Sequence, residues 1–228
     1  MVLDWCGPHH ATGLGSLYWF LSVGPDTSYH LAGIENEKSA NPVLLEKMPQ
    51  PVCRHVGHNR IRVLKVNGGP GFPTEQSNTI LRAWNLDYDQ SCPDHHYQVG
   101  EVEHWHSFHQ NAMRTLCSPA HSPSLLWEEL FPHGVELHNA NIHKQGENSP
   151  LEFMIRLAAG TRFHFVWGCL GDVHNHTSSR GPYKFQDSGI PCIYVGTGSF
   201  DCTHVAIRYF DNVCVANFFI LETGKPLV

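Results

Sequence analysis

The hydrophobic positions along this chain recur in short runs whose spacing is that of β-strands. The longest apolar run, residues 17–23, has the sequence Leu-Tyr-Trp-Phe-Leu-Ser-Val and predicts a buried strand. Other segments have the length and the β-branched and aromatic content of strands: residues 60–66, 80–86, 97–103, 152–157 and 162–167. Glycine and proline separate these segments along the whole chain, so the pattern predicts many short strands.

The clearest local structure lies near the end of the chain. Residues 203–210 and 213–221 are β-branched and aromatic runs, separated by the pair Asp211-Asn212. Asp and Asn tolerate the positive φ that a two-residue turn requires. This segment therefore predicts an antiparallel β-hairpin.

Only one segment carries the signals of a helix. Ser122 can cap it, Pro123 suits its first position, and Pro132 is expected to end it. Many short strands with one short helix predict a mostly β fold, which would be a cupin-like barrel, a jelly roll or a β-sandwich. We expect a single domain over residues 1–228, with a weak boundary at the Gly- and Pro-rich loop of residues 67–73.

Charge and hydropathy narrow the classes of partner. The formal net charge of −6 provides no basic field, so we expect neither nucleic acid nor a membrane as a partner. No apolar run approaches the roughly 20 residues that cross a bilayer, and no signal-peptide pattern is found, so we expect a soluble, cytoplasmic protein. Charged residues make up only 16% of the chain, which is compatible with a homo-oligomer or a protein partner.

Histidine is concentrated in the middle of the chain, where nine of the 18 histidines lie within residues 95–143. His104 and His106 follow a predicted strand, and the two-residue period of a strand would aim both to one side. His109 follows three residues later, and a returning strand could bring His138 or His143 opposite this first group. Because imidazole is a common ligand of zinc and iron, these five residues predict a site for a divalent transition metal, iron or zinc. Surface histidines that carry no metal are the alternative.

Two stretches around these histidines resemble a known family. Phe108-His109-Gln110-Asn111-Ala112-Met113 is similar to the Tyr-His-Arg-Asn-Cys-Met segment of the homogentisate dioxygenases, which are iron enzymes of the cupin fold, and residues 134–143 resemble a later histidine-bearing segment of that family. The resemblance implies that His109 and His143 are iron ligands and that His138 is a neighbouring active-site histidine. The family has a ligating glutamate six residues after its first histidine, where this chain has Thr115, so the implied ligand set lacks its carboxylate.

A second candidate site lies in Gly171-Asp172-Val173-His174-Asn175-His176. If this segment is extended, Asp172, His174 and His176 project from one face and could bind a metal together. The segment resembles the Gly-Asp-x-His motifs of calcineurin-like metallophosphoesterases, although the further motifs of that family are missing. A polar loop with an Asp turn is the alternative.

Three hypotheses about function follow, and the sequence does not decide whether the protein is an enzyme. The first is a metal-dependent enzyme on a β scaffold, such as a non-haem iron oxygenase that acts on a small organic or aromatic acid. The second is a non-catalytic β-sandwich that binds a protein partner or forms an assembly. The third is a metallophosphoesterase-like hydrolase built around Asp172.

Overall fold

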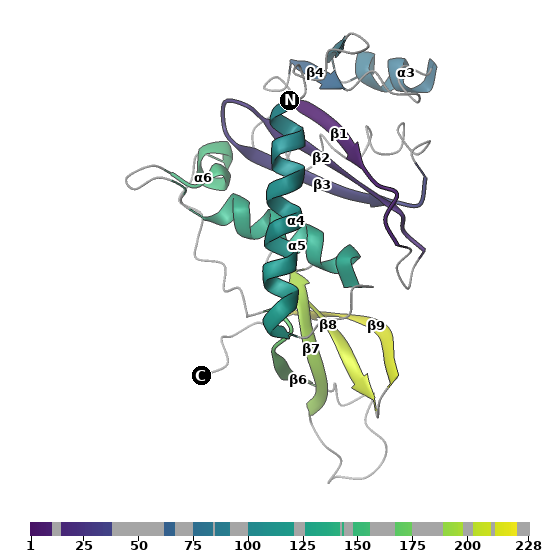
Figure 1. Cartoon of the computed structure of the whole chain (residues 1–228), viewed down its shortest axis with the longest axis vertical. Helices are drawn as coiled ribbons and strands as arrows, with labels where there is room; N and C mark the ends of the chain where they lie inside the picture. Colours follow the sequence, from purple (N-terminus) through teal and green to yellow (C-terminus); the bar gives the residue numbers. More distant parts are fainter. Residues whose placement is uncertain are drawn as a thin grey trace. The chain divides into compact units, whose positions relative to one another are not determined.

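Figure 1 shows the computed structural model of the chain. The structure describes residues 1–10, 15–37, 62–66, 75–83, 85–91, 100–120, 126–141, 143, 148–155, 167–174, 189–197, 203–210 and 213–222. The chain divides into two compact units: unit 1 comprises Met1–Met113 and Leu125–Gly160, and unit 2 comprises Arg114–Ser124 and Thr161–Val228.

Unit 1 is built on a five-stranded mixed sheet with the strand order β3-β2-β1-β4-β5. The strands are β1 (Val2–Cys6), β2 (Tyr18–Gly24), β3 (Tyr29–Glu35), β4 (Val63–Val66) and β5 (Asp87–Gln90). β1 lies in the centre of the sheet, antiparallel to β2 and parallel to β4. β4 and β5 are also parallel, and helix α3 (Glu75–Ala83) lies between them in the sequence, as a connection between parallel strands requires.

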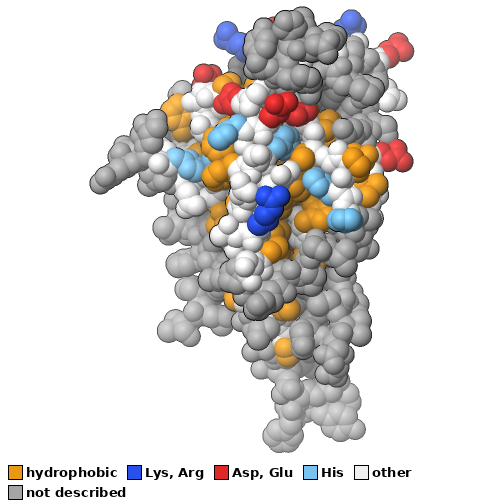
Figure 2. All heavy atoms as spheres, viewed as in Figure 1, with side chains coloured by type: hydrophobic (Ala, Val, Ile, Leu, Met, Phe, Trp, Pro, Cys, Tyr) orange, Lys and Arg blue, Asp and Glu red, His pale blue; other side chains and the backbone are white. Residues whose placement is uncertain are grey.

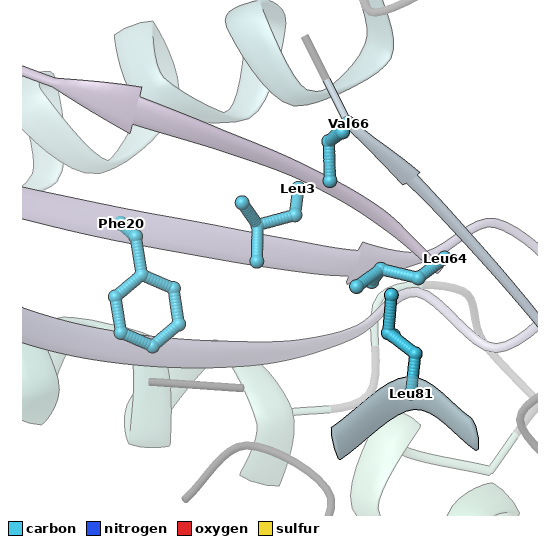
Figure 3. Packing of buried hydrophobic residues seen from close by; sticks show 5 residues of the cluster. All are labelled: Leu3, Phe20, Leu64, Val66 and Leu81. Atoms are coloured by element: carbon cyan, nitrogen blue, oxygen red, sulfur yellow. The ribbon is translucent and has the colours of Figure 1, made fainter. Parts of the chain in front are cut away.

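Side chains of the central strands alternate between the two faces of the sheet, and both faces are covered. On one face Leu3, Phe20, Leu64 and Val66 pack with Leu81 of α3, as Figure 3 shows. The intervening positions of β1 face helix α4, since Cys6 accepts a hydrogen bond from Gln110. A strand with two covered faces is expected to be apolar on both, and β2 is buried from Trp19 to Gly24.

Helix α4 (Gly100–Ala120) covers the second face of the sheet through one stripe of side chains. Among the side chains that the structure describes in α4, the buried ones are Val102, His106, His109 and Met113, which are spaced by four, three and four residues. This spacing is that of one face of an α-helix. Two of the four positions in the buried stripe are therefore histidines.

Two more helices complete unit 1, and both differ from the sequence prediction. The predicted helix was expected to end at Pro132, but α5 spans Trp127–Ala140 and contains Pro132. Pro132 removes one backbone hydrogen bond of the helix. Burial of the neighbouring side chains Leu130, Phe131 and Val135 offsets the free energy lost with that bond. Ser122 and Pro123, the predicted helix start, lie outside the described residues.

Helix α6 (Pro150–Ile155) occupies a segment where we predicted a strand at residues 152–157. It begins with a capping box, in which the Ser149 backbone N–H donates to the Glu152 carboxylate at 2.9 Å and the Glu152 N–H donates to the Ser149 hydroxyl at 3.2 Å. Pro150 follows the capping serine, a position that suits proline. Local capping thus favours a helix although the apolar run alone resembles a strand.

Of the other predicted strands, some are confirmed and others are wrong. The strand at residues 17–23 is confirmed as β2, and the one at residues 60–66 in part, as β4. The predictions at residues 80–86 and 97–103 are wrong, because these segments fall largely in α3 and in the start of α4. The predicted strand at residues 162–167 lies almost entirely outside the described residues.

Unit 2 contains an antiparallel four-stranded sheet with the order β6-β7-β8-β9. The strands are β6 (Leu170–His174), β7 (Gly189–Thr197), β8 (Thr203–Phe210) and β9 (Val213–Glu222). β8 and β9 pair in register from Phe210 opposite Val213, with an irregularity between Ile207 and Tyr209. The predicted C-terminal hairpin is therefore confirmed.

The prediction of a mostly β fold with one short helix is correct in part, because each unit contains a β-sheet. The five-stranded sheet is open, with β3 and β5 at its two edges, so the described residues form no closed cupin-like barrel. Helices α3, α4, α5 and α6 make unit 1 a mixed α and β structure. The single domain expected from the sequence stays a prediction. The weak boundary was expected at residues 67–73, and β4 and α3 on the two sides of that loop both belong to unit 1.

None of the helices in the described part of the chain is both long and apolar enough to cross a membrane.

The close fit between β2 and β3 leads to a first prediction. Gly33 lies directly opposite Phe20 in the sheet, and a Cβ atom at this position would overlap the Phe20 ring. Because Phe20 belongs to the buried core, Gly33→Ala should lower the free energy of unfolding by about 1 to 3 kcal/mol. The control is Gly134→Ala in α5, where a Cβ atom would meet no atom within 4 Å. Because alanine favours a helix more than glycine does, this substitution should raise the free energy of unfolding by up to about 1 kcal/mol. Urea denaturation measures both, and equal changes would show that the Phe20 contact does not matter.

Candidate functional site

Asp4 lies in the middle of the central strand of unit 1, on the face that α4 covers. Its side chain is 14% exposed and sits against His106 of α4, whose Nε2 is 4.0 Å from the Asp4 carboxylate. β4, the parallel neighbour, ends at Val66, which pairs with Leu3, so Asp4 stands one position beyond the end of β4. In open sheets of this kind ligands bind beyond the carboxyl ends of parallel strands. Asp4 is therefore a partly enclosed carboxylate at the level of the sheet where β4 ends.

Acidic side chains also mark the beginning of α4. Glu101 and Glu103 lie in its first turn, and both are exposed. Glu103 precedes His106 by three residues, so the two side chains are neighbours on the helix surface. Figure 2 shows acidic side chains, in red, in the region where α4 begins in Figure 1. Glu103 is thus an exposed carboxylate about one helical turn before the buried His106.

His106 is held by a second contact on its other nitrogen. The indole N–H of Trp19 donates to His106 Nδ1 at 3.0 Å, and both side chains are buried. The Trp19 ring is itself stacked on Phe131, with ring centroids 4.5 Å apart, and on His9, with centroids 4.2 Å apart. Burial lowers the pKa of His106 to about 4, although the backbone of Asp4 acts in the opposite direction. His106 is therefore neutral at pH 7.

A cluster of three further histidines lies between β3, α4 and α5, and we call it the histidine cluster: His30, His109 and His138. His30 Nδ1 and His109 Nε2 share a hydrogen bond of 2.9 Å, and the rings of His30 and His138 are stacked with centroids 3.9 Å apart. His138 Nε2 donates to the carbonyl of Ser28 at 3.0 Å. These contacts join residues that lie far apart in the sequence.

Asn139 fixes α5 to β3 beside this cluster. Its side-chain oxygen accepts from the backbone N–H of His30 at 2.9 Å, and its side-chain nitrogen donates to the carbonyl of His30 at 2.8 Å. Asn139 thus satisfies both backbone groups of a buried strand residue.

The histidines of the cluster have strongly lowered pKa values. Burial is the main cause in each case, and neighbouring histidines add to it: the pKa falls to about 2 for His30, about 3 for His109 and about 4 for His138. The neighbouring titratable side chains that lower these pKa values further are also histidines, namely His106 and His143 besides the members of the cluster, whereas the hydrogen bond to the Ser28 carbonyl raises the pKa of His138. The cluster is therefore neutral at pH 7 and unfavourable to protonate.

The structure brings together only part of the predicted five-histidine metal site. The strand geometry invoked for His104 and His106 is wrong, because both lie on α4, where side chains two residues apart point to different sides. His104 is exposed, while His106 and His109 are buried. His138 meets His109 in the histidine cluster, and the exposed His143 donates to the carbonyl of His138 at 2.9 Å.

The second predicted site lies in unit 2. Asp172 and His174 are on β6, opposite Pro191 and Gly189 of β7, so the expected extended segment is confirmed for them. His176 lies outside the described residues. Metal ligation at either predicted site stays a prediction, and among the described residues no group of three or more His, Cys, Asp or Glu side chains is placed to hold an ion.

Sequence reasoning missed Asp4, Trp19 and His30. A signal for Asp4 was present, because a carboxylate flanked by Val2-Leu3 and Trp5-Cys6 interrupts an apolar strand, and buried charges are rare unless they have a function or a partner. No local signal marks Trp19 or His30, since their partners lie on helices 79 or more positions away.

Comparison with known proteins gives a similarity of fold. No protein-family model matches the chain, and no curated protein matches it. Among solved structures, the catalytic core domain of BIV integrase is similar with a TM-score of 0.50 and 14% sequence identity, over 68% of this chain and 93% of that chain. At this identity the similarity concerns the fold alone.

Proposed function

We propose that unit 1 is a phosphoryl-transfer domain that depends on a divalent cation and acts on a nucleic-acid phosphodiester, as an integrase-like core. The observation that carries the proposal is Asp4, a carboxylate in the middle of the central strand with 14% of its side chain exposed. Such a group is reachable by a small cation but largely enclosed. The fold similarity to an integrase catalytic core supports the choice of reaction class.

The donor chemistry of the site fits magnesium or manganese. Mg²⁺ is usually bound by one or two carboxylates, together with water and substrate phosphates, and needs no complete cage of protein ligands. Asp4 would supply one carboxylate, and Glu103, next to His106 on α4, is the candidate for a second. A bound divalent cation stabilises negative charge on the oxygens of a phosphodiester as it reacts.

A nucleic-acid substrate is contrary to our expectation that a chain with a net charge of −6 does not bind nucleic acid. That expectation assumed that lysine and arginine must attract the phosphates. A divalent cation at a carboxylate site is the largest local charge and inverts the local sign, so phosphate can approach through the ion. The reacting phosphate therefore needs fewer lysine and arginine side chains nearby in order to bind.

The earlier hypotheses, an iron oxygenase, a binding module and a hydrolase at Asp172, remain proposals without a contact in the described residues that favours one of them. The phosphoryl-transfer proposal differs from them in the residue it requires, which is Asp4. It also differs in the metal, since carboxylate oxygens suit magnesium or manganese whereas imidazole suits zinc or iron.

Cleavage of labelled DNA and RNA oligonucleotides by the full chain tests the proposal. With Mg²⁺ or Mn²⁺ we expect cleavage that EDTA abolishes and that Asp4→Asn lowers at least about a hundredfold, as loss of a group that stabilises the transition state does. Asp89→Asn is the matched control, because Asp89 is an exposed aspartate on β5 of the same sheet. Metal-dependent cleavage that is unchanged by Asp4→Asn, or no cleavage by the folded wild type, would refute the proposal.

A further inference from the structure

The contact between Trp19 and His106 determines which nitrogen of His106 carries its proton. An indole N–H can only donate a hydrogen bond, so His106 Nδ1, at 3.0 Å, must be the acceptor. A neutral imidazole has one protonated nitrogen, and here it is Nε2. Because both rings are buried, solvent does not compete for this bond.

The protonated nitrogen faces the carboxylate of the candidate site. His106 Nε2 is 4.0 Å from Asp4 Oδ2, and the two side chains are 8% and 14% exposed. The stacking of Trp19 on Phe131 and His9 keeps the donor in place, so the imidazole has no freedom to exchange its two nitrogens. The Nε2–H group therefore lies beside Asp4, with the carboxylate at 4.0 Å, which is an electrostatic contact and too long for a hydrogen bond.

We infer that His106 is a positioning residue for Asp4, with Trp19 selecting the tautomer that presents Nε2–H to the carboxylate. A neutral N–H stabilises an ionised carboxylate without adding a full positive charge, which would repel an incoming cation. Lysine or arginine in this place would compete with the ion. The consequence for cation binding rests on the proposed function, whereas the tautomer and its orientation do not. Polar groups of the outer shell of a metal site commonly orient the ligating side chains and tune their charge.

Nitrogen NMR of histidine-labelled full chain tests the tautomer directly. Two-bond proton–nitrogen correlations distinguish a ring protonated on Nε2 from one protonated on Nδ1, and His106→Gln assigns the signal among the 18 histidines. We expect the Nε2–H form for His106 at pH 7, a mixture of both forms in Trp19→Phe, and a shift of the Nε2 signal in Asp4→Asn but not in Asp89→Asn. An Nδ1–H form in the wild type, or no response to Asp4→Asn, overturns the inference.

Mn²⁺ affinity then tests the consequence, with two substitutions of opposite character. His106→Gln keeps an acceptor for Trp19 and a donor for Asp4, whereas His106→Phe keeps the ring shape and has neither. We expect the Mn²⁺ dissociation constant to rise at least about tenfold in His106→Phe and to stay within about threefold in His106→Gln and in His104→Phe, an exposed control on the same helix. A folded His106→Phe variant with unchanged affinity overturns the positioning role.

The two measurements separate failure of this inference from failure of the proposed function. If the wild type binds no Mn²⁺, the phosphoryl-transfer proposal fails, and the NMR experiment alone decides whether Trp19 and His106 direct the N–H at Asp4. If Mn²⁺ binds and depends on Asp4 but not on His106, the proposed function stands and the positioning role is refuted.

Discussion

Acidification from pH 6.5 to about 4.5 is expected to unfold unit 1. The histidine cluster is neutral when folded, with pKa values of about 2, 3 and 4 for His30, His109 and His138, because burial disfavours the charged form. In the unfolded chain each has a pKa near 6.5, so below that pH the unfolded state binds more protons and stability falls as the pH falls. Each histidine contributes up to about 1.4 kcal/mol per pH unit, which amounts to about 7 kcal/mol for the three histidines of the cluster between pH 6.5 and 4.5. His106, whose pKa burial lowers to about 4, adds about 2 kcal/mol in the same direction. Typical domains have 5 to 15 kcal/mol in total.

Urea denaturation at several pH values between 7 and 5 measures this effect. The decimal logarithm of the unfolding constant should change by about three to four per pH unit near pH 5.5, which corresponds to uptake of about three protons by the cluster and nearly one more by His106. His109→Gln should lower this slope by about one, whereas His104→Gln, at an exposed position of the same helix, should leave it unchanged. A free energy of unfolding that is the same at pH 7 and pH 5 would show that the buried histidines do not titrate as described.

Phe131→Ala should be the most damaging single truncation in the layer between α5 and the sheet. Phe131 is completely buried, stacks on Trp19 with an angle of 13° between the rings, and meets the edge of His109 at a centroid distance of 5.9 Å. Loss of a buried phenylalanine side chain costs about 3 to 5 kcal/mol, from lost burial and from the cavity left behind.

A phenylalanine on a neighbouring helix provides the control for Phe131. Phe153 of α6 is 52% exposed, so Phe153→Ala should change the free energy of unfolding by less than about 0.5 kcal/mol. Both variants are measured by urea denaturation at pH 7. A cost below about 1 kcal/mol for Phe131→Ala would mean that its ring does not hold α5 on the sheet.

The sequence predicted the strands that are visible as runs of β-branched and aromatic residues. β2 and the hairpin of β8 and β9 are of this kind, because their residues are β-branched or aromatic and their turn or flanking residues break the run. These elements depend on local composition, so no knowledge of distant contacts was needed to find them.

Helix α4 was missed because of the residues that form its buried stripe. Val102, His106, His109 and Met113 have helical spacing, but two of them are histidines and do not count as apolar in a hydrophobic pattern. The same histidines were assigned to a strand end and to a metal site for lack of that helix. Their burial depends on Trp19 and His30, which only the folded sheet brings to α4.

The candidate site could be predicted only in part. The five-histidine prediction included His106, His109 and His138, which do lie on one side of the sheet, but their hydrogen bonds to Trp19, His30 and Ser28 require no metal. Asp4 was visible as a charge inside an apolar segment, yet its neighbour on α4 lies 102 positions further along the chain. Pairings at this separation depend on the topology of the sheet.

A crystal of the full chain grown with Mn²⁺ and measured at the manganese absorption edge tests the central claim most directly. The phosphoryl-transfer proposal predicts an anomalous peak in contact with the Asp4 carboxylate, at the roughly 2.0 to 2.2 Å typical of small divalent cations and oxygen ligands, and no such peak in Asp4→Asn. A peak at the histidine cluster or at Asp172 with none at Asp4, or no ordered manganese at millimolar concentration, would contradict it.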